Sequence, residues 1–311
     1  MSGRSLSTAL DASRQSRSLP PLVPPRPRMT ACGGKNGPIP VDVSFMKTIA
    51  PIVLAALPFF SAAQATQASS CGATVFDVAG RSTGFSDFSP LNRERVVAAT
   101  CKAASGSPGV QVAAFAYSTQ PVGKQMSVDE AKELAVMLID AGHRRVLASY
   151  KQRVDEDALT RIDEHSLSLD SASYLLAPGV RAYGLRFHSA AGSASCADQT
   201  FDQLLSLFVT SGTAMRPVLR LNMSVERAIS GCIGAAVPGY VVEPAMLTVA
   251  IAPTSSHGYA DLVVRAKIAP FGSETAKHVP KQRSETRTLR YDGQRYVVPE
   301  QEVWWLKDVG L

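Results

Sequence analysis

Short apolar runs separated by polar breaks fill most of the chain beyond residue 105. The run at 109–118 is apolar and aromatic, and glycine or proline stands close to both of its ends. Runs of this length, with turn residues recurring about every ten positions, are typical of β-strands rather than helices. The pattern therefore predicts a mainly β fold of antiparallel β-sandwich-like lobes, with one or two short helices.

Five pairs of these runs flank a short break that contains glycine, which is the pattern of a β-hairpin. The expected hairpins span 133–151, 173–187, 201–223, 245–269 and 288–297. The last of them carries the strongest signal, because its Asp292-Gly293 break supplies two residues that tolerate the positive φ of a tight hairpin turn.

Two segments carry helix signals instead. Residues 91–104 follow a Ser-Pro pair and end before a glycine, which predicts a helix over this stretch. A capping box begins at Ser127, so one helical turn is expected just before the 133–151 hairpin. Both helices are short, in keeping with a mainly β fold.

The segment from Met46 has the three parts of a cleavable signal peptide. Lys47 gives a positive start, residues 49–60 form an uncharged apolar stretch, and Ala63-Gln64-Ala65 supplies small residues for signal peptidase. The apolar stretch is shorter than the roughly 20 residues that a bilayer-spanning helix needs, so a membrane anchor is the weaker alternative. The mature chain is expected to begin near Thr66.

The first 45 residues are rich in proline and have no periodic apolar pattern. Such a segment buries too little surface to offset its ordering entropy. A signal peptide works at a true N-terminus, which favours a start at Met46; an unusually long region before the signal is the alternative. The expected organisation is a disordered or wrongly included extension at 1–45, a signal peptide at 46–65, and β-rich lobes at 66–190 and 191–311.

The net charge of the chain depends on this leader. The full chain has a formal net charge of +6, but residues 1–65 hold seven basic and two acidic residues. The remainder keeps 25 basic and 24 acidic residues, a net charge of +1. Nucleic-acid and anionic-membrane partners require clustered Lys and Arg, so neither is expected. No integral membrane segment is expected once the signal has been removed.

Four cysteines remain in the mature part, Cys71, Cys101, Cys196 and Cys232. An even number in an exported chain predicts two disulfides and a periplasmic or secreted location. Three pairings are open, and sequence order favours Cys71–Cys101 and Cys196–Cys232, one in each lobe. A four-thiolate zinc site is the alternative, but the Cys-x2-Cys pairs of such sites are missing from the sequence.

Ser255, His257 and Asp261 are the candidate catalytic residues, because they combine a nucleophile, a base and an orienting acid. Triad members must converge in space, which residues around one hairpin turn rarely do, and no Gly-x-Ser-x-Gly motif strains the serine. An ordinary hairpin loop is therefore the preferred interpretation. In that case His257 is exposed at the tip and has no serine or carboxylate partner.

Other candidate binding residues are weaker. The acidic loop at 155–164 could offer oxygen ligands to calcium but lacks the spacing of an EF-hand, so no metal and no cofactor are expected. Trp304 and Trp305 would face opposite sides of a strand, which leaves one free to stack on a sugar or anchor a partner; packing of the C-terminus is the simpler interpretation. The partner is unknown, with an envelope protein or a glycan as the candidates.

The export signal, the cysteine-bearing β-rich body and the closing Tyr-Asp-Gly-x-x-Tyr hairpin at 291–296 resemble exported proteins of Gram-negative bacteria that have no assigned activity. The resemblance implies a periplasmic location and transfers no functional residue. The leading hypothesis is a soluble, non-catalytic periplasmic binding or structural protein. The alternatives are a cell-envelope hydrolase that uses His257 with a serine or carboxylate, and an accessory subunit of an envelope complex.

Overall fold

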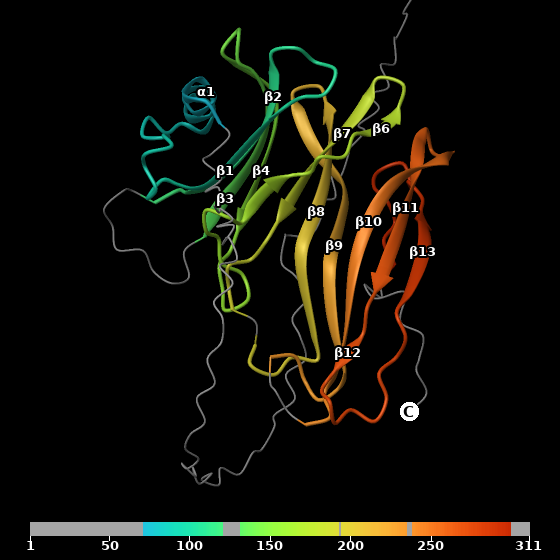
Figure 1. Cartoon of the computed structure of the whole chain (residues 1–311). Coiled ribbons are helices and arrows are strands. Elements are labelled where there is room, and N and C mark those ends of the chain that lie inside the picture. Colours follow the sequence, from blue (N-terminus) through green and yellow to red (C-terminus); the bar gives the residue numbers. More distant parts are fainter. Residues whose placement is uncertain (1–70, 121–130, 193, 235–237, 300–311) are drawn as a thin grey trace, which may run out of the picture.

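The computed structural model describes residues 71–120, 131–192, 194–234 and 238–299. Strands dominate this part of the chain, which confirms the mainly β prediction (Figure 1). In chain order the elements are α1 (Ala73–Thr83), β1 (Val96–Ala103), β2 (Val110–Ser118), β3 (Lys132–Asp140), β4 (Arg145–Val154), β5 (Leu167–Leu169), β6 (Tyr174–Ala177), β7 (Val180–Phe187), β8 (Gln199–Ser211), β9 (Ala214–Ser230), β10 (Val241–Ser256), β11 (Tyr259–Ile268), β12 (Phe271–Gly272) and β13 (Arg283–Leu289).

The strands of the described residues belong to one connected sheet. Strands β1 to β4 form an antiparallel meander. The long strands β8, β9 and β10, the tall central ribbons of Figure 1, are antiparallel neighbours, and β11 and β13 follow them. A single parallel register pair, Ser149 of β4 with Ala214 of β9, joins the meander to the long strands.

Four of the five expected hairpins are present: β3–β4, β6–β7, β8–β9 and β10–β11. Gly179 and Gly212, in two of the turns, have positive φ, a conformation that glycine adopts without steric cost. The fifth hairpin is reduced to an isolated bridge between Tyr291 and Tyr296. The Tyr296 backbone N–H points away from this bridge and donates to the carbonyl oxygen of Val218 on β9.

The helix expected over 91–104 is wrong, because residues Val96–Ala103 form β1 and pair with β2. The side chains of Val96 and Ala98 are buried while that of Val97 is less so, an alternation with the period of a strand. β-Branched residues also lose rotamer freedom in helices and fit a pleated surface better. Pairing with the apolar strand β2 outweighs the local start and stop signals.

Helix α1 lies in a segment for which the sequence signals predicted no helix. Its buried residues are Val75, Phe76, Val78, Ala79 and Gly80. Their spacing is that of an amphipathic helix, and the helix ends at Gly84, which has the left-handed conformation of a C-cap. The usual start signal is missing, because Gly72 occupies the N-cap and offers no side-chain hydrogen bond.

Apolar side chains cover both faces of the meander. On one face, Phe76 of α1 and Phe88 pack against Phe115 of β2, with ring centroids 5.3 and 5.1 Å from that of Phe115. On the other face, Ala116 and Leu134 belong to a cluster that also contains side chains of β5, β7 and β8. The meander is therefore the middle layer between α1 and these later strands.

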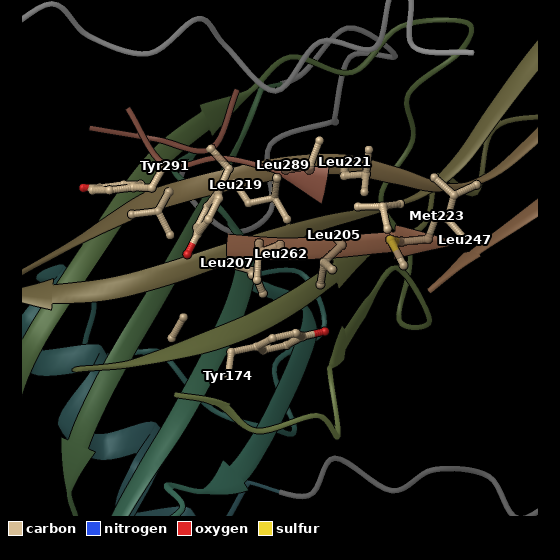
Figure 2. Packing of buried hydrophobic residues seen from close by; sticks show 14 of the residues in the cluster. Tyr174, Leu205, Leu207, Leu219, Leu221, Met223, Leu247, Leu262, Leu289 and Tyr291 are labelled. Carbon is tan, nitrogen blue, oxygen red and sulfur yellow. The ribbon is translucent and has the colours of Figure 1, made fainter. Parts of the chain in front are cut away.

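A further core fills the space among the later strands. Figure 2 shows leucines of β8, β9 and β11 pointing toward one another, among them Leu205, Leu219 and Leu262, which are almost fully buried. Tyr174 of β6 contributes to the same cluster. Burial of this apolar surface holds strands β6 to β13 together.

Both predicted disulfides are present, Cys71–Cys101 and Cys196–Cys232, with Cα–Cα distances of 4.9 and 5.0 Å. The first joins the start of α1 to β1, and the second joins the segment before β8 to the loop after β9. Disulfides are typical of proteins in oxidising compartments. Within the part of the chain that the structure describes, no helix has the length and hydropathy to cross a membrane.

Strands β7 and β8 lie on either side of residue 190, where the sequence placed a boundary between lobes. They are antiparallel neighbours in the sheet, so strand pairing is continuous across this position. The division into two lobes stays a prediction. The 1–45 extension, the signal peptide at 46–65, the capping box at Ser127, and Trp304 and Trp305 lie outside the described residues.

Candidate functional site

The β10–β11 hairpin carries His257 at its tip, where the residue has a φ of 48°. The side chain is exposed, and its Nδ1 lies 2.9 Å from the backbone oxygen of Tyr291. Among the described residues it forms no hydrogen bond with Ser255 or Asp261, and the Asp261 carboxylate instead accepts a hydrogen bond from Thr254. The structure does not bring the three candidate catalytic residues together as a triad.

Asp261 has the surroundings of a structural residue. Its side chain is buried, and Thr254 Oγ1 donates to its Oδ2 at 2.7 Å. The Tyr296 hydroxyl donates to the backbone oxygen of the preceding residue, Ala260, at 2.6 Å. Burial raises the pKa of Tyr296 well above its ordinary value, and the nearby negative charge of Asp261 raises this pKa further. These contacts fasten the 291–296 turn onto β11.

The acidic loop at 155–164 uses its carboxylates to hold its own backbone. Asp157 Oδ1 accepts hydrogen bonds from the N–H groups of Leu159 and Thr160, and Glu156 Oε2 lies 3.3 Å from the Nζ of buried Lys132. No group of three or more His, Cys, Asp or Glu side chains arranged to hold a metal ion occurs among the described residues. The loop residues therefore act as turn and ion-pair residues here.

A pocket of about 310 Å³ lies where β7 ends and where the start of β8 runs beside the end of β9. We refer to it as the β8–β9 pocket. Its lining residues are Leu159, His188, Ser189, Ala191, Gly192, Ala194, Ala197, Gln199, Thr200, Phe201, Asp202, Ser224 and Glu226. Its volume is at the small end of the range of roughly 300–1,000 Å³ that is usual for ligand sites. The Cys196–Cys232 disulfide anchors the segment that contributes Ala194 and Ala197.

Four polar side chains form a square on one face of the β8–β9 ribbon. Thr200 is directly opposite Glu226, and Asp202 is directly opposite Ser224. Residues two apart on a strand face the same side, and directly opposed residues share a face. The two carboxylates therefore occupy one diagonal of the square, and the two hydroxyls occupy the other. The alternate residues Phe201 and Val225 face the apolar core instead.

His188 extends this polar surface from the end of β7. Its backbone N–H donates to the carbonyl oxygen of Ser166, which fixes the residue at the rim. The imidazole Nδ1 lies 2.6 Å from Asp202 Oδ1, and both side chains are partly exposed. This pairing holds the imidazole ring by one nitrogen and leaves Nε2 facing away from the carboxylate. His188 and Asp202 are therefore a preorganised pair at the pocket.

A histidine held by a carboxylate is the base of a catalytic triad, but the third member is missing from the described residues. The hydroxyl of the neighbouring Ser189 donates to the carbonyl oxygen of Leu159 at 2.8 Å and accepts the N–H of Arg161 at 3.1 Å. Among the described residues, no serine or threonine hydroxyl and no cysteine thiol forms a hydrogen bond with the His188 imidazole. The arrangement supplies hydrogen bonds and negative charge, which are means of binding.

The sequence patterns singled out neither His188 nor Asp202, Ser224 and Glu226. At the start of the expected 201–223 hairpin, the alternation of polar Thr200 and Asp202 with apolar Phe201 was the signal that could have indicated a polar face.

The chain matches no protein-family model, and no curated protein or solved structure is significantly similar to it. The candidate site therefore rests on its own geometry.

Proposed function

We propose that this chain is an exported binding protein without catalytic chemistry of its own, whose ligand occupies the β8–β9 pocket. Export is supported by the three-part signal at 46–65 and by the two disulfides, which persist in oxidising compartments. A periplasmic location follows from this proposal and from the resemblance of the chain to exported proteins of Gram-negative bacteria.

The observation that carries the proposal is the composition of the pocket. Two carboxylates, three hydroxyls and one imidazole line a concave surface, beside the small apolar side chains of Ala191, Ala194 and Ala197. Binding sites characteristically combine an apolar wall with a few placed polar groups. Strands and a disulfide position these groups, so little ordering is needed when a ligand enters.

Binding is better supported than hydrolysis. A hydrolase of the type considered from the sequence needs a base within hydrogen-bond reach of a nucleophile. His257 contacts a backbone oxygen, and His188 contacts a carboxylate. Neither histidine has a hydroxyl partner among the described residues, so no activated nucleophile supports the hydrolase alternative.

Native mass spectrometry of the protein purified from the periplasm tests this proposal. The wild type should carry a small molecule that is released by denaturation and is chemically unchanged after prolonged incubation. Ser224→Phe, which places a ring inside the pocket, should lack it. Ser255→Phe, at the exposed β10–β11 hairpin, is the matched control and should retain it. Circular dichroism checks that both variants fold, and a Ser224→Phe protein that is folded and still loaded would contradict the proposal.

A further inference from the structure

We infer that the β8–β9 pocket selects a small organic cation, such as a primary amine, over neutral and anionic molecules of the same shape. The inference rests on the proposed binding function and names the class of its ligand. It is carried by the balance of charge in the pocket and by the hydroxyl groups that lie opposite the two carboxylates.

The lining has an excess of negative charge. Asp202 and Glu226 are both present, and no Lys or Arg occurs among the described lining residues. Among the described residues, the charged partner of Asp202 is His188, and the side chain of Glu226 has no ion pair or hydrogen bond. When His188 is neutral the lining carries two negative charges, and when His188 is protonated it still carries one.

Nearby basic residues do not neutralise this charge. Arg227 follows Glu226 on β9, where its register partner is Gln199 of β8, but it is not among the lining residues of the pocket. Arg186 stands near the end of β7, but its guanidinium lies 2.7 Å from the carboxylate of Asp170. The negative charge of the pocket is therefore left for a ligand.

The donor groups of the pocket favour an organic cation over a metal ion. Asp202 and Glu226 are diagonal neighbours across the strand pair, and each lies directly opposite a residue with a hydroxyl group, Ser224 and Thr200 respectively. Metal ligands must converge within about 2–2.6 Å of one ion, and no such convergent group exists among the described residues. An ammonium group with several N–H donors can approach one carboxylate while the hydroxyl oxygens of Thr200 and Ser224 accept its further hydrogen bonds.

The volume of the pocket sets an upper limit on the size of its ligand. A pocket of about 310 Å³ admits a molecule of the dimensions of an amino acid or a monosaccharide. The ammonium is expected at the carboxylates and the body of the molecule against the alanine side of the lining.

Isothermal titration calorimetry with three phenyl-chain probes of similar size tests the inference: phenethylamine (a cation), 2-phenylethanol (neutral) and phenylacetate or 3-phenylpropionate (anions), at pH 7.5 and low salt. Binding of phenethylamine is expected in the millimolar range that suits so small a molecule. It should be at least about tenfold tighter than that of 2-phenylethanol, while the anion should not bind. Raising the salt concentration should weaken the amine selectively.

Variants locate the effect. Glu226→Gln and Asp202→Asn, which keep the shapes of the side chains, should each reduce the preference for the amine, and the double variant should abolish it. Glu94→Gln, which removes an exposed carboxylate elsewhere, is the matched control and should bind like wild type. Equal binding of all three probes in the pocket would overturn the cation inference while leaving the binding function intact. Failure of every probe to bind would count against both, and amine binding that survives the double variant would place the selectivity elsewhere.

Discussion

Replacing Arg95 with methionine should reduce the free energy of unfolding by about 3–5 kcal/mol, the usual cost of removing one partner from a buried charged network. The Arg95 side chain is 5% exposed. Its Nη1 donates to the backbone oxygens of Ser118 at 2.6 Å and Gln120 at 2.7 Å, and its Nε lies about 3 Å from both oxygens of Asp87. The guanidinium also lies 4.3 Å from the ring centroid of Phe85.

The magnitude follows from what the substitution leaves behind. Each hydrogen bond to a charged group contributes about 1.5–3 kcal/mol, and a methionine supplies no donor. Asp87 is partly exposed, so water solvates that carboxylate after the change and limits the loss. The oxygen of Ser118 lies in a buried surrounding, so its lost donor is the largest part of the cost. Arg95→Lys should reduce the free energy of unfolding by less than Arg95→Met, because lysine keeps the positive charge. Some loss should remain, because a single ammonium cannot replace the planar fork of the guanidinium.

Urea unfolding measures this loss as a lower midpoint with an unchanged slope. The matched control is Arg93→Met, because Arg93 makes an exposed ion pair with Glu164 at 3.6 Å and such pairs contribute at most about 1 kcal/mol. If Arg95→Met and Arg93→Met have the same effect, the reasoning about the buried network is refuted.

The Arg95–Asp87 pair also predicts that the stability of the fold depends on pH. The hydrogen bond from Arg95 holds the pKa of Asp87 below its ordinary value. A carboxyl with a lower pKa in the folded state stabilises the fold above its unfolded pKa of about 3.9, and this contribution disappears as the pH falls through the folded value. The wild type should therefore lose more stability below about pH 4 than Arg95→Met does. Parallel stability curves of the two proteins over pH 2–6 would contradict this.

Three further outcomes are expected. Gly80→Ala should lower the free energy of unfolding by about 1 kcal/mol or more, although alanine has the better helix propensity. The reason is that the added Cβ would lie 2.8 Å from the backbone oxygen of Phe85. A higher urea midpoint would contradict this. Replacing Cys196 and Cys232 by alanine should lower the free energy of unfolding by about 3–4 kcal/mol, because the unfolded chain is no longer constrained by a loop with sequence separation 36. Urea unfolding measures this loss, and an unchanged midpoint would contradict the prediction. N-terminal sequencing of the secreted protein should begin near Thr66, and a product that retains residues 1–45 would refute export from Met46.

Structural features that depend on residues adjacent in the sequence could be predicted from the sequence. The turn glycines Gly179, Gly212 and Gly258 marked three hairpins because a positive φ is a local requirement. The two disulfides followed from sequence order. The helix at α1 was missed because its N-cap is Gly72, and the strand β1 was mistaken for a helix because its partner β2 outweighs local signals.

The site depends on features that local patterns do not carry. The β8–β9 ladder contains an irregularity between Leu207 and Phe208, which shifts the pairing by one residue. Counting back from the turn at Gly212 without this bulge would set Thr200 opposite Val225, a polar residue against an apolar one, and the polar square would not be recognised. The His188–Asp202 pair also needs β7 to lie beside β8, a neighbour relation that no turn signal announces.

The most direct test of the central claim is a titration of the isotopically labelled protein with phenethylamine, followed by NMR. The account predicts saturable shifts of the His188 imidazole and of the amides of Thr200, Asp202, Ser224 and Glu226, with the His257 hairpin unchanged. Shifts that centre on His257, or none at the β8–β9 pocket at saturating amine, would contradict it.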